Sequence, residues 1–233
     1  MANRKCLKKA DKADDIYTQM TDIENVLQHY RSHFTGKFVY CNCDDPFESN
    51  FFKYFLINFN SFALKKLIST CYNYSPISGE ELPVFNLKSG RKIAYQILIS
   101  KVICNIGDYA EVMGDVGSLM VGRRNKLIPL KGNGDFRSDE CIETLKKANI
   151  IVTHPPHSLF REYVAQLMEY KKKFLIIGRK EAAGYEEISS LIKKNRIRIF
   201  SGFSDDTATF YSPRNKGGMV EIPGTVWFTN LDI

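Results

Sequence analysis

The chain has 233 residues, 44% of them hydrophobic and 25% charged, which excludes a disordered chain and allows a sizeable hydrophobic core. No apolar run reaches the roughly 18 residues that a transmembrane helix needs, and residues 1–15 lack the apolar stretch of a signal peptide. The formal net charge of +7 favours a polyanionic partner, because lysine and arginine release counterions from a phosphate backbone.

We expect a single domain over residues 1–233, with no membrane segment. The six cysteines show no disulfide framework and several lie in apolar, strand-like runs, which favours a reducing, cytoplasmic location. Residues 1–13 are rich in lysine and are predicted to be a flexible basic arm, which either touches phosphate or is simply solvated.

The Y-T-Q segment (Tyr17, Thr18 and Gln19) follows this arm and is interpreted as a turn. It leads into a helix predicted from Asp22 to about Phe34, because apolar residues recur there at helical spacing. Asp22 is a favourable N-cap for that helix.

A buried strand is predicted over residues 37–43, K-F-V-Y-C-N-C, as the first strand of a doubly wound sheet. It ends at the D-D-P-F loop (Asp44, Asp45, Pro46 and Phe47), and a helix is expected to follow over residues 50–58. Backbone here can approach a ligand closely, beside the free N–H groups of a helix N-terminus. The alternative is that Asp44 only caps that helix.

A second strand is predicted over residues 64–72, and it ends without an acidic side chain. Alternation mixed with turn residues predicts an insertion, a hairpin or small sheet, over residues 75–130. Its basic cluster of Arg123, Arg124 and Lys126 is interpreted as a solvated loop rather than a phosphate site.

The G-D-F-R segment (Gly134, Asp135, Phe136 and Arg137) is expected at the end of the third parallel strand or in its loop. Ser138 then caps a helix that reaches about Ala148, with acidic residues near its start and basic residues near its end.

The most informative stretch is residues 149–173, where a strand at 150–153 stops at the H-P-P-H loop (His154, Pro155, Pro156 and His157). Proline lacks a backbone N–H and has a fixed φ, so the two prolines form a rigid corner. An amphipathic helix follows, for which Ser158 is a plausible N-cap. Polar groups at the carboxyl end of a strand lie where open α/β sheets bind ligands.

The remaining segments are expected to complete the sheet. Residues 172–178 read as a strand that Gly178 breaks, and residues 184–195 as an amphipathic helix. The apolar runs after residue 197, one of them containing Trp227, read as closing antiparallel strands.

The segment T-H-P-P-H-S-L-F-R-E-Y resembles the Asn-Pro-Pro-Phe loop of amino-group DNA methyltransferases, and more narrowly that of the EcoRI-type adenine-specific DNA methyltransferase family. The family loop is Asn-Pro-Pro-Phe-Ser-Leu-Phe, so His154 stands at the Asn position and His157 at the Phe position. The Y-T-Q, D-D-P-F, G-D-F-R-S and W-F-T-N-L-D segments also resemble family motifs. The resemblance is weak over residues 75–130, and the family continues past the point where Ile233 stands.

This resemblance implies a Rossmann-like methyltransferase fold, with a mostly parallel twisted sheet, helices on both faces and antiparallel C-terminal strands. It implies S-adenosylmethionine as cofactor, DNA as partner and a role in restriction–modification, and it places the carboxylate of Asp135 on the cofactor's adenine. The implied cofactor-binding residues are Tyr17, Thr18, Gln19, Cys43, Asp45, Pro46, Phe47, Asp135 and Phe136. The implied catalytic residues are His154, Pro155, Pro156 and His157.

Methylation of the adenine N6 amino group requires that the base leave the helix stack and that acceptors take its amino protons. In the family the acceptors are the Asn side-chain carbonyl and the backbone carbonyl of the first Pro, and the aromatic residue after the second Pro stacks on the base. Neutral His154 has one acceptor nitrogen, whereas the protonated ring has none. With an ordinary pKa near 6.5, His154 would lose its acceptor just below neutral pH.

The loop therefore belongs to an active, an altered or an inactive methyltransferase. The alternative function is a methyltransferase-fold protein that binds cofactor, nucleic acid or a nucleotide without methylating adenine. Cys41, Cys43, His154 and His157 also form a zinc-type ligand set on neighbouring strands, but C-x-C is not a usual zinc spacing, so no metal site is predicted.

Overall fold

A computed structural model describes residues 16–73, 93–102, 124–212 and 218–232. The predicted basic arm at residues 1–13, most of the predicted insertion, and Arg123 lie outside the described residues. Among the helices of the described ranges, none is long and apolar enough to cross a membrane.

The main sheet has eight strands in the order β5-β4-β3-β2-β6-β7-β11-β8. The strands are β2 (Phe38–Cys41), β3 (Lys66–Thr70), β4 (Tyr95–Ile99), β5 (Lys126–Pro129), β6 (Ile150–Thr153), β7 (Lys173–Arg179), β8 (Arg198–Phe200) and β11 (Thr225–Thr229). The central strands β3, β2, β6 and β7 are parallel to one another, whereas β4, β5, β11 and β8 pair antiparallel at the two sides. The predicted α/β sheet with closing antiparallel strands is confirmed.

The chain order reverses between β2 and β6. From β2 the chain moves outward through β3, β4 and β5, and it then returns to the other side of β2 as β6 and continues outward through β7. The carboxyl ends of β2 and β6 therefore flank a topological switch point, the place where open α/β sheets bind ligands.

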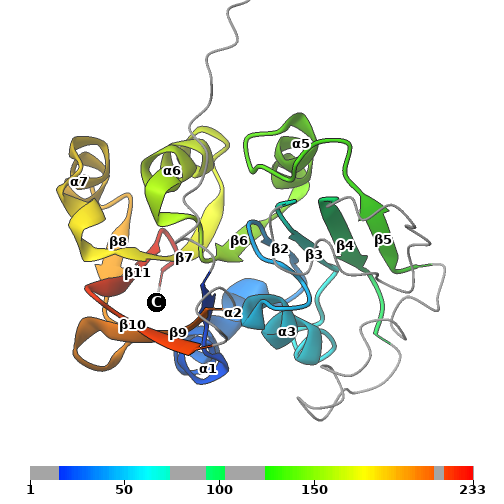
Figure 1. The fold of residues 1–233 in the computed structure, drawn as a ribbon, viewed down its shortest axis with the longest axis horizontal. Coiled ribbons are helices and arrows are strands. Elements are labelled where there is room, and N and C mark those ends of the chain that lie inside the picture. Colours follow the sequence, from blue (N-terminus) through cyan, green and yellow to red (C-terminus); the bar gives the residue numbers. More distant parts are fainter. Residues whose placement is uncertain (1–15, 74–92, 103–123, 213–217, 233) are drawn as a thin grey trace, which may run out of the picture.

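Helices cover both faces of this sheet (Figure 1). One face carries α1 (Met20–Leu27), α2 (Arg31–Phe34) and α3 (Asn50–Ile57), and the other carries α5 (Asp139–Lys147), α6 (Phe160–Glu169) and α7 (Glu186–Lys193). Strand residues alternate between the two cores, because successive side chains point to opposite faces. Val39 and Cys41 join the core under α1–α3, whereas Phe38 and Tyr40 join the core under α5–α7.

A second sheet of three antiparallel strands, β1-β9-β10, lies on the α1 side of the molecule (Figure 1). Its strands are β1 (Tyr17–Thr18), β9 (Thr207–Ser212) and β10 (Gly218–Pro223). The sequence predicted a turn at the Y-T-Q segment, and this was wrong for Tyr17 and Thr18, which pair with Tyr211 and Phe210. The strand β10 was not predicted.

Several helix boundaries also differ from the sequence predictions. The first helix begins at Met20, two residues before the predicted cap Asp22. Ser49, not Asp44, caps α3, because the Ser49 hydroxyl accepts from Phe51 N and Phe52 N. A 3₁₀ turn at His157–Leu159 precedes α6, so Ser158 does not act as its N-cap.

Gly178 does not break β7, which continues through it to Arg179. A Cβ at Gly178 would lie 2.4 Å from Cε2 of Phe160, so the glycine is needed to let α6 pack against the strand.

Candidate active site

The D-D-P-F and H-P-P-H loops are joined at the switch point by the buried carboxyl group of Asp44. Its Oδ1 accepts a hydrogen bond of 2.7 Å from the Ser49 hydroxyl at the start of α3. Its Oδ2 contacts the Thr153 hydroxyl at the end of β6, and the backbone N–H of His154 also donates to Asp44. One side chain therefore connects the loop after β2, the first turn of α3 and the loop after β6.

Burial raises the pKa of Asp44 from 3.8 to about 7. The hydrogen bonds around Asp44 are consistent with a protonated carboxyl group. The Thr153 hydroxyl contacts both Asp44 Oδ2 and the Asn42 carbonyl oxygen, but a hydroxyl has only one proton to donate. Since the carbonyl can only accept, a protonated Asp44 that donates to Thr153 completes the chain to Asn42.

Asp45 is also buried, at 3% exposure, and its carboxylate is held in a fixed orientation. Oδ1 accepts from the Phe47 N–H at 2.9 Å and from the Tyr95 hydroxyl at 3.1 Å. Tyr95 comes from β4, and its ring packs edge-on against Phe47 with 5.8 Å between centroids. Sequence reasoning missed Tyr95, because it lies in a segment where no motif was recognised.

Cys43 connects the loop after β2 to the G-D-F-R segment. It adopts a left-handed φ of 69°, and burial raises the pKa of its thiol, with Asp44, Cys141 and Asp135 contributing. Cys43 therefore lies within electrostatic range of both Asp44 and Asp135.

Arg137 donates hydrogen bonds to both carboxylate oxygens of Asp135. Oδ1 accepts from Arg137 N and Nε, both at 2.9 Å, and Oδ2 accepts from Nη2 at 2.7 Å. This pairing raises the pKa of the Arg137 guanidinium, which also donates from Nη1 to Glu162 of α6 at 2.6 Å. The ring of Phe136, in contrast, packs into the core against Tyr163 of α6.

Gly134 allows the backbone of the G-D-F-R segment to pass close to the end of β3. It has a φ of +78°, and a Cβ there would lie 2.1 Å from the carbonyl oxygen of Cys71, just beyond β3. The predicted third parallel strand is not adjacent to β3. β5 runs in the same direction as β3, but the antiparallel strand β4 lies between them. Asp135 nevertheless follows β5 on the carboxyl side of the sheet.

Replacing Gly134 with alanine is expected to cost more stability than the same change at Gly36. Both glycines have positive φ, but a Cβ at Gly36 (φ +68°) meets no atom within 4 Å. Gly36→Ala should therefore cost only the left-handed strain, about 1–2 kcal/mol. Gly134→Ala should add about 1–3 kcal/mol from the clash with Cys71. Urea unfolding measures both values, and equal costs would contradict the close approach of the two segments.

The two rings of the H-P-P-H loop are hydrogen-bonded to each other. His154 Nε2 and His157 Nε2 are 2.7 Å apart, and the ring centroids are 4.8 Å apart with a tilt of 48°. Phe210 of β9 packs on His154 at 5.0 Å between centroids. Burial, and secondarily His157, lowers the pKa of His154 well below 6.5. The sequence-based expectation that His154 loses its acceptor just below neutral pH is therefore wrong, because the ring stays neutral there.

The small sheet brings the Y-T-Q segment to the same region. The backbone carbonyl of Thr18 accepts from Asn50 Nδ2 at 2.7 Å, at the first residue of α3. The neighbouring strand β9 supplies Phe210, which covers His154. Segments from both ends of the chain thus meet the loops after β2 and β6.

Four buried polar atoms in this region have no hydrogen-bond partner among the residues that the structure describes. They are Thr18 Oγ1, Asn42 Nδ2, His154 Nδ1 and Tyr163 OH. The Tyr163 hydroxyl is close enough to Cys43 and Asp44 for their charges to raise its pKa further after burial. Buried polar groups are rarely left without partners, so each of these atoms is a candidate for contact with a polar ligand.

The alternative zinc set does not form. In the described ranges no three His, Cys, Asp or Glu side chains are grouped so that they could hold a metal ion, and Cys41 and Cys43 are free thiols.

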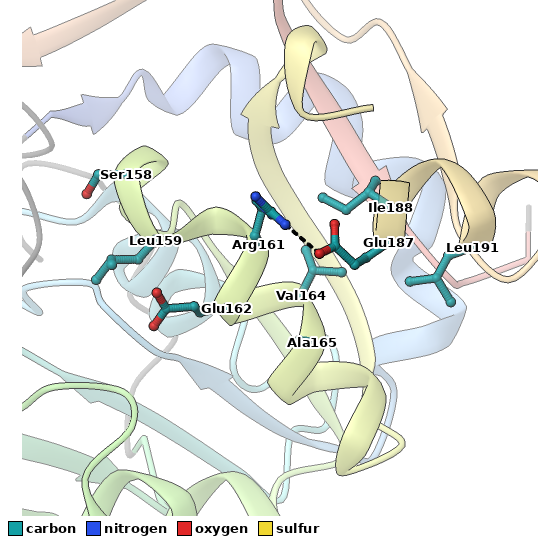
Figure 2. Close-up of a pocket in the computed structure, with 9 residues that line it drawn as sticks. All are labelled: Ser158, Leu159, Arg161, Glu162, Val164, Ala165, Glu187, Ile188 and Leu191. Carbon is teal, nitrogen blue, oxygen red and sulfur yellow. Dashed lines mark hydrogen bonds and ion pairs between the residues drawn. The ribbon is translucent and has the colours of Figure 1, made fainter. Parts of the chain in front are cut away.

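A pocket of about 440 Å³ lies on the outer surface between α6 and α7 (Figure 2). Arg161 and Glu187 form an ion pair across it, and Ser158 and Leu159 line the end that follows the H-P-P-H loop. None of the predicted site residues lines this pocket.

A mixed sheet with a parallel core and helices on both faces, with ligand-suited loops after β2 and β6, defines this chain as an α/β protein of the methyltransferase fold. The chain belongs to the EcoRI-type methyltransferase family, because residues 6–233 match the family described as "Adenine-specific methyltransferase EcoRI".

Three relatives illustrate this membership. The chain is 40% identical over 249 aligned residues to the Type II methyltransferase M.EcoRI of Escherichia coli, covering 100% of this chain and 70% of the relative. It is 33% identical to the Type II methyltransferase M.MgeORF184P of Mycoplasma genitalium and 32% identical to M.MpnI of Mycoplasma pneumoniae. Both alignments cover 96% of this chain and 63% of the relative. No solved structure matches the chain.

Proposed function

We propose that the protein is an S-adenosylmethionine-dependent DNA methyltransferase that modifies the N6 amino group of adenine. The adenine would leave the duplex and meet the H-P-P-H loop, since its amino group cannot be reached inside the base stack. The observation that carries this proposal is the position of His154 at the switch point, where its Nδ1 is buried without a partner in the described structure and a lowered pKa favours the neutral ring. Family membership and the net charge of +7 support DNA as the partner.

The cofactor would be held where the loops after β2 and β5 approach each other. S-adenosylmethionine, when bound, supplies an electrophilic methyl group. The fit rests on two fixed carboxylates, Asp45 and Asp135, and on the unpartnered buried atoms of Thr18 and Asn42. Arg137 leaves lone pairs on Asp135, because each carboxylate oxygen can accept two hydrogen bonds. Asp135 can therefore accept from an exocyclic amino group while Arg137 holds it in place.

The residues of the H-P-P-H loop would act together on the flipped base. Nδ1 of His154 accepts one amino hydrogen when Nε2 carries the ring proton, and the backbone carbonyl of Pro155 accepts the other. When both hydrogens of the adenine amino group are held by these acceptors, the lone pair of its nitrogen can point at the methyl group of the cofactor. The ring of His157 offers a flat surface for the base, and the two prolines limit movement of the corner.

The runner-up is a relative that binds cofactor or nucleic acid without methylating adenine. The observation in its favour is that Asp135 already has a strong ionic partner in Arg137, while both loop positions that differ from the family motif are paired with each other. Cofactor binding without any methyl transfer would support this second function.

Calorimetry with S-adenosylmethionine tests the cofactor site. We expect Asp135→Asn to weaken binding by roughly tenfold or more, since it removes a charge-assisted hydrogen bond worth about 1.5–3 kcal/mol. Glu162→Gln is the matched control, because Glu162 is the other carboxylate on Arg137 and is 48% exposed on α6. Its affinity should stay within about twofold of the wild type. Equal losses in the two variants, or no binding by the wild-type protein, would contradict the assignment.

A further inference from the structure

The pairing of His154 with His157 has a chemical consequence beyond base recognition. We propose that the two imidazoles form a proton relay that removes the proton released when the amino group is methylated. This inference rests on the proposed function, and it assigns His157 a role in proton transfer in addition to stacking. It is motivated by the direct Nε2–Nε2 hydrogen bond of 2.7 Å between two half-buried rings, of which His154 has a lowered pKa because of desolvation.

The hydrogen bond restricts the tautomers of the pair. Two neutral imidazoles can share one proton between their Nε2 atoms, so one ring donates and the other accepts. If His154 donates, its Nδ1 keeps a lone pair, which is the state that can accept from an amino group. His157 then accepts at Nε2 and carries its own proton on Nδ1.

Each step of the relay conserves protons and charge. When the adenine nitrogen gains a methyl group, it becomes positively charged and must lose one of its two protons. That proton moves to Nδ1 of His154, while the Nε2 proton of His154 moves to Nε2 of His157. His157 becomes an imidazolium and releases a proton to solvent, and the pair returns to its starting tautomer by exchange with solvent after the product leaves.

The surroundings favour movement in this direction. His154 is packed under Phe210 and resists protonation, because burial lowers its pKa well below 6.5. His157 is partly exposed, and it makes a minor contribution to the lowered pKa of Glu181, which is caused mainly by hydrogen bonds from the Glu181 backbone and Arg179. Because His154 resists protonation, a proton that reaches its Nδ1 is expected to be passed on from Nε2 to His157.

Among the described residues, the loop after β2 and the 3₁₀ turn after β7 place charged groups near the pair. Asp44, in the loop after β2, accepts the backbone N–H of His154, and its raised pKa of about 7 makes it mostly neutral below that pH. Glu181, in the 3₁₀ turn after β7, is ionised and paired with Arg179 at 3.3 Å. The strand β9 contributes the apolar ring of Phe210.

Single-turnover methyl transfer to a DNA duplex, measured across pH, tests the relay. His157→Phe keeps a flat ring for the base but cannot accept a proton from His154. We expect its rate to fall by roughly 10²-fold, within the range of general acid–base catalysis, with little change in affinity for S-adenosylmethionine. The relay needs an unprotonated Nε2 on His157, so the wild-type rate should fall as acid is added, and His157→Phe should lack this fall.

Two further variants separate the relay from the proposed function. Glu181→Gln removes the acid beside His157, so the acidic fall in rate should move to lower pH. The double variant His154→Asn/His157→Phe carries the residues of the family loop and should methylate without the acidic fall. If His157→Phe keeps the wild-type rate and pH profile while the wild type methylates, the relay is wrong and the proposed function stands. If only the double variant methylates, the histidine pair blocks the reaction and both proposals fail for the natural sequence.

Discussion

His154→Ala is expected to reduce methyl transfer to DNA by roughly 10²–10³-fold, comparable to removing one hydrogen-bonding group aimed at a reacting centre. Alanine removes the acceptor Nδ1, which is buried and has no partner among the described residues. It also removes the tilted ring that packs against Phe210. Single-turnover assays with labelled S-adenosylmethionine measure the rate, and circular dichroism and calorimetry show whether folding and cofactor affinity are kept.

Two comparisons make this result interpretable. His154→Asn introduces a side-chain carbonyl that accepts at all pH values, so it should retain far more activity than His154→Ala. His29→Ala is the matched control, because His29 is an exposed histidine in the 3₁₀ turn after α1. Its rate should equal that of the wild type. Full activity of His154→Ala would remove His154 from the reaction.

Asp44→Asn is expected to change how stability depends on pH. The folded chain holds the Asp44 proton up to about pH 7, whereas an unfolded carboxyl group releases it near 3.8. Between these values the folded state binds more protons than the unfolded state, so the free energy of unfolding falls as pH rises. The contribution of this one group amounts to at most about 1.4 kcal/mol per pH unit. This stabilising contribution is fully present below pH 3.8, and it is lost as the pH rises to the folded-state pKa of about 7.

Asparagine imitates the protonated acid at every pH. Its amide can donate to Thr153 as the protonated carboxyl group does, and its carbonyl oxygen can accept from Ser49. The variant should therefore be similar to the wild type below pH 3.8 and more stable than it at pH 8, as measured by urea unfolding at several pH values. Asp139→Asn, at an exposed acid in the first turn of α5, should instead give a curve parallel to that of the wild type. Parallel curves for Asp44→Asn as well would show that Asp44 is ionised in the fold.

The features that local chemistry determines could be predicted from the sequence. The strand Ile150–Thr153 ends where the double proline removes two N–H groups, and Ser138 caps α5 by accepting from Cys141 N. The alternating faces of β2, β6 and β7 likewise follow from apolar runs. These signals are read within a few residues, which is why the parallel core was predicted correctly.

The rest depends on partners that are distant in the chain. Tyr17 and Thr18 form a strand only because β9 lies 190 or more residues later, as the pairing of Tyr17 with Tyr211 shows. Two residues carry too little pattern to predict such a strand. Strand β10 has the alternating burial of a strand with two different faces. It lies between two more apolar runs, which give the stronger strand signal in the sequence.

The candidate site was predicted in its loops but not in its connections. The sequence suggests for Asp44 only the role of a helix cap. The neighbouring residues do not reveal that Thr153 and the backbone N–H of His154 contact its carboxyl group. Similarly, the lowered pKa of His154 depends on burial under Phe210, which a ring in a turn does not reveal. The ion pair between Arg137 and Asp135 joins residues only two positions apart, so the sequence spacing alone allows it to be predicted.

Nucleoside analysis of DNA treated with the protein and S-adenosylmethionine tests the central claim most directly. Mass spectrometry after complete digestion identifies which base gained the methyl group. A neutral His154 acceptor at the switch point predicts N6-methyladenine in DNA treated with the wild-type protein, and its near absence with His154→Ala. Methylation of another base by the wild type, or no methylated base from a folded protein that binds the cofactor, would contradict the proposed adenine methyltransferase.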